Sequence, residues 1–91
     1  LMWNSIDFAG KHFAEAKGAE FIDLTSAEVD AWKKATAPVI EDYVKTMVAD
    51  GHTESDVRSW LSYLDERIKY WTDKQIKLFI KSPTGPPEMR P

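Results

Sequence analysis

The feature that most constrains this chain is a helical repeat of apolar residues in its second half. Between residues 57 and 78, apolar side chains recur alternately four and three positions apart, with one polar interruption at Gln75. That spacing is typical of a helix that packs against another helix through a narrow seam. Residues 3–17 and 29–48 also place apolar side chains on one helical face. We therefore expect a mainly α-helical chain.

Capping signatures indicate where the helices begin and end. Thr25 is followed three residues later by Glu28, which is the pattern of a capping box, and Thr53 with Asp56 is a second cap. Gly18 follows the last apolar residue of the first periodic segment and suits the left-handed position after a helix. These boundaries predict three helices, near residues 3–17, 26–50 and 53–80.

Prolines interrupt the helical pattern in two places. Pro38 lies inside the second expected helix, and we expect a bend near residues 34–38 because proline removes a helical hydrogen bond. Four of the five prolines fall in the last ten residues. We therefore expect a helical segment over residues 1–82, followed by an extended, flexible tail at 83–91.

One short run does not fit the helical pattern. Residues 20–24, Glu-Phe-Ile-Asp-Leu, alternate in polarity and predict a strand. A strand needs a partner for its backbone N–H and C=O groups, and no second strand is recognisable in the sequence. The question of its partner stays open at this point.

Size and composition exclude several classes of protein. With 91 residues, no cysteine and a net charge of −3, the chain is one domain at most and has neither a disulfide framework nor a thiolate metal site. No apolar run approaches the roughly 20 residues of a transmembrane helix. There is no signal peptide, and the start at Leu1 suggests a chain cut from a longer one.

No group of reactive side chains converges, so we expect neither an enzyme nor a cofactor. His12 and Glu15 share a helical face, but two ligands do not make a metal site. The acidic pairs at residues 41–42 and 65–66 diverge by about 100° on a helix. Four serines are nucleophiles in name only, because none lies in a nucleophile turn; they are Ser26, Ser55, Ser59 and Ser62.

Aromatic and basic residues alternate near the end of the third expected helix, as in platforms that bind single-stranded nucleic acid. They are Lys69, Tyr70, Trp71, Lys74 and Lys77. Trp71 already belongs to the apolar repeat, and the lysines complement the negative end of the helix dipole. The chain is also mildly acidic, so we expect no nucleic-acid partner.

Residues 2–52 resemble the C-terminal part of the solute-binding subunits of TRAP transporters, the DctP type. The likeness rests on three stretches taken together. One is "AKGAEFIDL", a Lys-Gly turn that leads into a short strand. Another is "LTSAEVDAWKKATAPVIEDYV", a cap followed by Trp32, an Ala-Pro-Val run and Tyr43. The last is the stop at Gly51 before a closing helix.

The resemblance implies a parent protein of two α/β lobes around a cleft, several-fold longer than this chain. The strand at 20–24 would then pair with earlier sequence of that parent. The parent would capture a small organic anion, usually a carboxylate, in the periplasm and deliver it to membrane permease subunits. Its carboxylate-binding arginine would also lie earlier, since Arg58, Arg67 and Arg90 match no ligand motif. The isolated chain is therefore expected not to bind the solute.

An alternative interpretation is a free-standing helical interaction module that associates with itself. In either case the apolar repeat needs cover, and a second copy can provide it. We therefore expect a homo-oligomer, a dimer or a tetramer. The expected self-association face consists of Val57, Trp60, Leu61, Leu64, Ile68 and Trp71.

Overall fold

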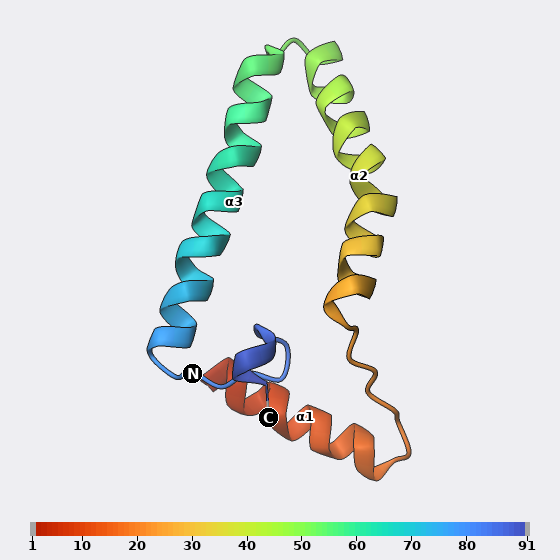
Figure 1. The fold of residues 1–91 in the computed structure, drawn as a ribbon, viewed down its shortest axis with the longest axis vertical. Coiled ribbons are helices and arrows are strands. Elements are labelled where there is room, and N and C mark those ends of the chain that lie inside the picture. Colours follow the sequence, from red (N-terminus) through yellow and green to blue (C-terminus); the bar gives the residue numbers. More distant parts are fainter. Residues whose placement is uncertain (1, 91) are drawn as a thin grey trace. The chain divides into compact units, whose positions relative to one another are not determined.

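The computed structural model describes residues 2–90 and confirms a mainly α-helical chain. Its α-helices are α1 (Met2–Ala16), α2 (Ser26–Ala49) and α3 (Glu54–Lys77), and a short 3-10 helix, η1 (Pro87–Met89), follows them (Figure 1). The chain divides into two compact units. We call residues 22–65 the hairpin unit, and residues 2–21 together with 66–90 the terminal unit. Helix α3 contributes to both.

The predicted capping residues begin α2 and α3. The Thr25 hydroxyl accepts a hydrogen bond from the Glu28 backbone N–H at 3.2 Å, and a Glu28 carboxylate oxygen accepts one from the Thr25 N–H at 2.7 Å. At the start of α3, the Thr53 hydroxyl accepts from the Asp56 N–H at 3.2 Å. These bonds satisfy N–H groups that have no partner within the helix. The predicted starts are confirmed to within one residue.

Glycine ends α1 and α2. Gly18 has φ of 89° and Gly51 has φ of 104°, a region that glycine enters without steric cost. After α2, the His52 N–H donates to the Met47 carbonyl and the Gly51 N–H to the Val48 carbonyl, both at 3.1 Å. This pair of bonds is the Schellman motif. It satisfies the last carbonyls of α2 and reverses the chain into α3 (Figure 1).

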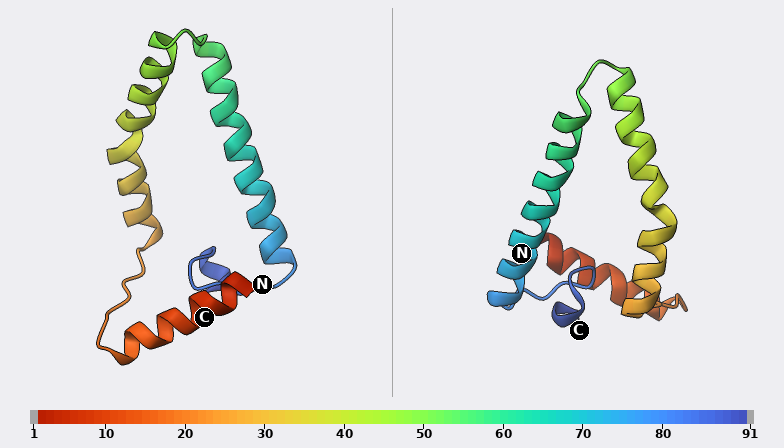
Figure 2. Two further views of the ribbon diagram at one scale, coloured as in Figure 1. Left: turned by 180° about the vertical axis from the view of Figure 1, so that it is seen from behind. Right: turned by 45° about the horizontal axis from the view of Figure 1, so that its top comes forward.

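The hairpin unit buries one large apolar side chain from each of its two helices. Val44 of α2 is 3% exposed and Val57 of α3 is fully buried. Both lie near the turn at residues 50–53. Away from the turn, α2 and the first half of α3 separate (Figure 2), and the side chains of α2 become exposed.

Helix α2 continues through Pro38. Proline has no N–H, so the helical bond to the Lys34 carbonyl is lost. One turn earlier, the Thr36 hydroxyl donates to the Trp32 carbonyl at 2.8 Å and lies 3.3 Å from the Lys33 carbonyl. The helix therefore tolerates the proline without ending, and the bend near residues 34–38 stays a prediction.

Helix α3 ends at Lys77, three residues before the predicted end at residue 80. Phe79 has φ of 53° and occupies the left-handed position that glycine takes after α1 and α2. The Ile80 N–H donates to the Gln75 carbonyl and the Phe79 N–H to the Ile76 carbonyl, both at 3.1 Å. The prediction was wrong here because the apolar pattern continues past the point where the backbone turns. A bulky residue in this conformation costs roughly 1–2 kcal/mol, so sequence rules do not expect it.

The segment after α3 forms a closed turn, where an extended tail was expected. The Ser82 N–H donates to the Met89 carbonyl at 3.0 Å, and Arg90 Nε donates to the Gly85 carbonyl at 2.7 Å. Met89 is 3% exposed and Ser82 is 6% exposed. The extended conformation is therefore corrected for residues 83–90, because these bonds and this burial close the turn. The flexibility of the segment stays a prediction.

Residues 20–24 form no strand within residues 2–90. They belong to the irregular connection between α1 and α2, and each of them is exposed. Phe21 is 49% exposed, Ile22 76% and Leu24 46%. The strand prediction is therefore not confirmed. The physical reason is the one raised by the sequence: a strand is stable only when it pairs, and the described chain offers no partner.

Candidate functional site

The expected self-association face lies along α3, and we call it the α3 seam; it consists of Val57, Trp60, Leu61, Leu64, Ile68 and Trp71. Its six members differ in burial. Val57 is fully buried inside the hairpin unit and Leu61 is half-buried. The remaining four are exposed by 42–63%; they are Trp60, Leu64, Ile68 and Trp71. The accessible part of the seam therefore begins at Trp60. Val57 stabilises the hairpin itself.

Exposed apolar side chains extend beyond the α3 seam. In residues 2–90, twenty large apolar or aromatic side chains are at least 42% exposed, whereas only Val44, Val57 and Met89 form the buried apolar core. The exposed set includes residues from every helix and from the α1–α2 connection. A monomeric soluble protein rarely leaves so many large apolar side chains uncovered, and such surfaces mark sites of interaction.

Arg58 connects the two helices of the hairpin unit. Its Nη1 and Nη2 donate to the two carboxylate oxygens of Glu41 on α2, at 3.2 and 2.9 Å. Its Nε donates to Glu54, one turn earlier on α3, at 3.0 Å. The planar guanidinium suits this two-pronged geometry. Arg58 is therefore engaged by two carboxylates of its own chain.

Charge and hydrogen bonding shift the pKa values of these groups. Hydrogen bonds and charge attraction from Arg58 lower the pKa of Glu41, and the two carboxylates raise the pKa of Arg58. In the capping box, hydrogen bonds from the backbone and side chain of Thr25 lower the pKa of Glu28. Each effect favours the charged form that is present at neutral pH. The charged carboxylates of Glu41 and Glu28 therefore keep the contact between α2 and α3 and the capping box at the start of α2.

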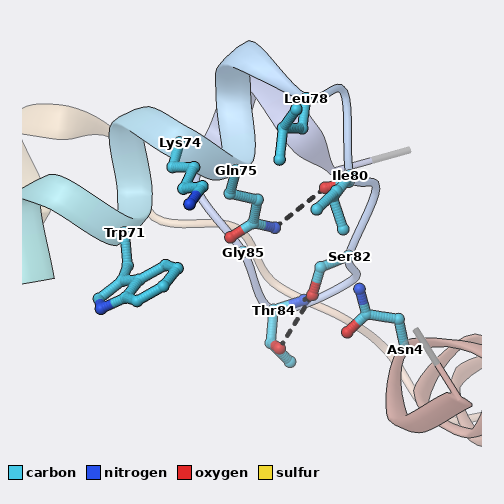
Figure 3. A pocket seen from close by; sticks show the side chains of 9 residues that line it. All are labelled: Asn4, Trp71, Lys74, Gln75, Leu78, Ile80, Ser82, Thr84 and Gly85. Atoms are coloured by element: carbon cyan, nitrogen blue, oxygen red, sulfur yellow. Dashed lines mark hydrogen bonds between the residues drawn. The ribbon is translucent and has the colours of Figure 1, made fainter.

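A pocket of about 450 Å³ lies in the terminal unit, between the end of α3, the turn that follows it and the start of α1 (Figure 3). Its polar groups already hold the turn. Gln75 Nε2 donates to the Ile80 carbonyl at 3.0 Å, and Asn4 Nδ2 donates to the Lys81 carbonyl at 3.1 Å. Lys74 is the one cationic side chain of the lining. The side chains of Gln75 and Asn4 in this pocket therefore hold the turn at residues 78–86 in place.

Gly85 makes the close approach in this pocket possible. A Cβ atom at this position would lie 2.7 Å from Gln75 Nε2 and 3.1 Å from Ser82 Cβ. A side chain at residue 85 would therefore displace the amide that holds Ile80. This contact could not be predicted from the sequence, because Gly85 lies in a proline-rich stretch where a glycine has many explanations.

The alternating aromatic and basic residues of α3 form a cluster in the terminal unit. The Arg67 guanidinium lies 4.6 Å from the centroid of the Tyr70 ring, and Lys74 Nζ lies 4.9 Å from that of Trp71. The two rings meet edge to face with centroids 5.1 Å apart. Such cation–π contacts orient the cations over the rings. The sequence identified most of these residues but missed Arg67.

The other candidate residues stay apart. Glu15 pairs with Lys11 at 3.9 Å, and across residues 2–90 no three His, Asp or Glu side chains are grouped to hold a metal ion. The Ser59 hydroxyl donates to the Asp56 carbonyl at 2.7 Å, a local helical bond. The Ser59 side chain is therefore engaged by the backbone of its own helix.

Comparison with models of known protein families, with curated proteins and with solved structures finds no match for this chain. None of the described helices is both long and apolar enough to cross a bilayer. The most distinctive features of the molecule are therefore its uncovered apolar side chains and the basic–aromatic cluster on α3.

Proposed function

We propose that this chain is a helical segment of a TRAP transporter solute-binding subunit. The complete protein captures a small organic acid, a carboxylate, in the periplasm and delivers it to membrane permease subunits. The observation that carries the proposal is the uncovered apolar surface. Such a surface is expected of a segment whose partners lie elsewhere in a larger fold.

The magnitude of the missing burial supports this interpretation. Fully burying one large apolar side chain contributes about 1.5–3 kcal/mol. The twenty exposed residues are on average about half covered. Burying the rest of their surface would contribute roughly 1 kcal/mol for each, or about 20 kcal/mol together. That exceeds the net stability of a typical domain, about 5–15 kcal/mol. Cover from further polypeptide would therefore dominate the energetics of this chain.

The sequence resemblance over residues 2–52 indicates which larger fold this is. It also assigns a place to the connection at residues 20–24, as an added strand of a sheet built from earlier sequence. Phe21, Ile22 and Leu24 are exposed here, as expected for a segment without its neighbours. Solute binding belongs to the rest of the protein, since Arg58 is held by Glu41 and Glu54.

Hydrogen exchange tests this proposal at residues 20–24. We expect the backbone amides of Phe21, Ile22 and Leu24 to exchange freely in the 91-residue chain. In the product of the complete reading frame, the amides of this run that face the partner strand should be protected, because carbonyl groups of that strand accept their hydrogen bonds. Free exchange in both proteins would contradict the proposal.

The second candidate function is a free-standing module that associates with itself. The accessible part of the α3 seam favours it, because Trp60, Leu64, Ile68 and Trp71 follow one helical face and are exposed. A seam with this spacing suits helix packing at a small crossing angle. The reading frame distinguishes the two functions. A signal peptide and α/β sequence upstream support the transporter subunit, and a start codon next to Leu1 supports the module.

Sedimentation equilibrium tests self-association through the seam. We expect a dimer or tetramer of the 10.4 kDa chain at tens of micromolar. Leu64→Glu should give monomers, because it puts a charge into the seam. Tyr63→Glu is the matched control on the same helix, since Tyr63 is 62% exposed but lies off the seam. A monomeric wild-type chain, or equal effects of both substitutions, would contradict association through this face.

A further inference from the structure

The second half of α3 and the turn after it concentrate the positive charge of this acidic chain. Residues 67–81 contain five of the twelve basic residues and only one of the fifteen acidic ones. Lys69 pairs with that acid, Asp73. The segment therefore carries a net charge of +4 in a chain whose total is −3. The other basic residues are Arg67, Lys74, Lys77 and Lys81.

Three of these cations share one face of α3 with an aromatic side chain, and Lys81 lies beyond the end of the helix. Residues three and four apart are neighbours on a helix, so Arg67, Tyr70, Lys74 and Lys77 form a continuous stripe, which Leu78 follows just past the end of α3. We call it the basic–aromatic face. A groove of about 360 Å³ lies on it, lined by Tyr70, Asp73, Lys74, Lys77 and Leu78. The α3 seam follows a neighbouring stripe of the same helix, and Trp71 lies where the two meet.

The turn that follows this face exposes two large apolar side chains. Leu78 is 57% exposed and Phe79 is 75% exposed. Phe79 is fixed by the hydrogen bonds of the turn in a left-handed conformation that costs roughly 1–2 kcal/mol for a residue with a side chain. An exposed aromatic residue kept in a costly backbone conformation points to a function for its side chain.

We propose that the basic–aromatic face and Phe79 bind the surface of an anionic phospholipid bilayer. Lysine and arginine are attracted to the lipid phosphates, and tyrosine lies well at the level of the headgroups. Leu78 and Phe79 enter the boundary with the acyl chains, so the helix lies in the interface and does not span the membrane. The bases of a nucleic acid stack on aromatic rings but not on leucine. The aliphatic Leu78 beside Phe79 therefore favours the boundary with the acyl chains.

This proposal does not depend on the proposed function. It uses residues of the terminal unit alone, and it leaves the α3 seam available for the rest of a larger protein. Both can therefore fail or succeed separately.

Vesicle co-sedimentation of the full chain tests the proposal. One set of vesicles is phosphatidylcholine alone, and in the other about one third of the lipid is phosphatidylglycerol. We expect binding to the anionic vesicles only, and a decrease as salt is raised, because salt screens the attraction. Equal binding to both sets, or no binding to either, would overturn the proposal.

Two variants measure separately how much the positive charge and the apolar side chain contribute to vesicle binding. Lys74→Gln/Lys77→Gln should weaken binding about twenty-five-fold, at about fivefold for each basic residue near the surface. Phe79→Ser should weaken it about tenfold, through lost apolar burial. The control is Lys33→Gln/Lys34→Gln on α2, which also removes two exposed lysines and should leave binding unchanged. Circular dichroism checks that each variant keeps its helices.

The pattern across the variants decides the proposal. Loss in both the lysine and the Phe79 variants, with the control unchanged, supports it. An equal loss in the control shows attraction by net charge alone and overturns it. Unchanged vesicle binding by Phe79→Ser would also overturn the proposal, because Phe79 then makes no apolar contact with the bilayer. A single-stranded oligonucleotide and polyglutamate are added as competitors. If either one removes the chain from the vesicles and binds it more tightly than the vesicles do, the basic–aromatic face binds that class of partner and the proposal is overturned.

Discussion

Replacing Val57 by alanine should destabilise the hairpin unit more than any comparable change in an exposed position. Val57 is fully buried. The substitution removes two carbon groups, worth about 0.8 kcal/mol each, and leaves a small cavity that adds to the cost. Alanine returns about 0.5 kcal/mol through its higher helix propensity. We therefore expect a net loss of about 1.5 kcal/mol in the free energy of unfolding.

Val39→Ala is the matched control, because it makes the same chemical change in a helix of the same unit. Val39 is 64% exposed, so only about a third of the transfer term is lost, and the helix propensity of alanine offsets it. We expect a change near zero. Urea unfolding, followed by far-ultraviolet circular dichroism at one protein concentration, measures both. Losses that agree within about 0.5 kcal/mol would refute the burial assigned to Val57.

Two further predictions concern single contacts. Because Arg58 lowers the pKa of Glu41 below its ordinary value of 4.5, this pair stabilises the fold above pH 4.5 and the stabilisation is lost as the pH falls through the lowered pKa. Unfolding measured across that range should show a smaller loss for Glu41→Gln; an identical pH profile would contradict the ion pair. At residue 79, glycine should give a more stable chain than alanine by about 0.5 kcal/mol, because the left-handed strain exceeds the entropic cost of glycine. Thermal unfolding of Phe79→Gly and Phe79→Ala decides this, and the reverse order would show that the turn is not strained.

The helix starts were predictable because their signals are local. The Thr25 hydroxyl and the Glu28 carboxylate satisfy N–H groups within one turn, so four residues of sequence contain all that the geometry requires. Gly18 likewise marks the end of α1 through its own backbone freedom. The periodic apolar positions between these signals were enough to identify the helices.

The parts that sequence missed depend on contacts between distant residues or on an unusual backbone. Phe79 ends α3 in a conformation that glycine or asparagine would normally take, so nothing in its identity marks the end. Arg58 and Glu41 are 17 residues apart, and their bond depends on how the hairpin closes. The turn after α3 requires Gly85 beside Gln75. A strand at residues 20–24 requires a partner, which local pattern cannot supply.

Calorimetric titration of organic carboxylates tests whether this chain belongs to a solute-binding subunit. We predict that the product of the complete reading frame binds one of a panel of such acids with one-to-one stoichiometry. The 91-residue chain should show no heat of binding with any of them, because Arg58 is occupied by Glu41 and Glu54 and no carboxylate site is assigned to this segment. Binding of an organic acid by the 91-residue chain itself, or a complete product that binds none of them, would contradict the account.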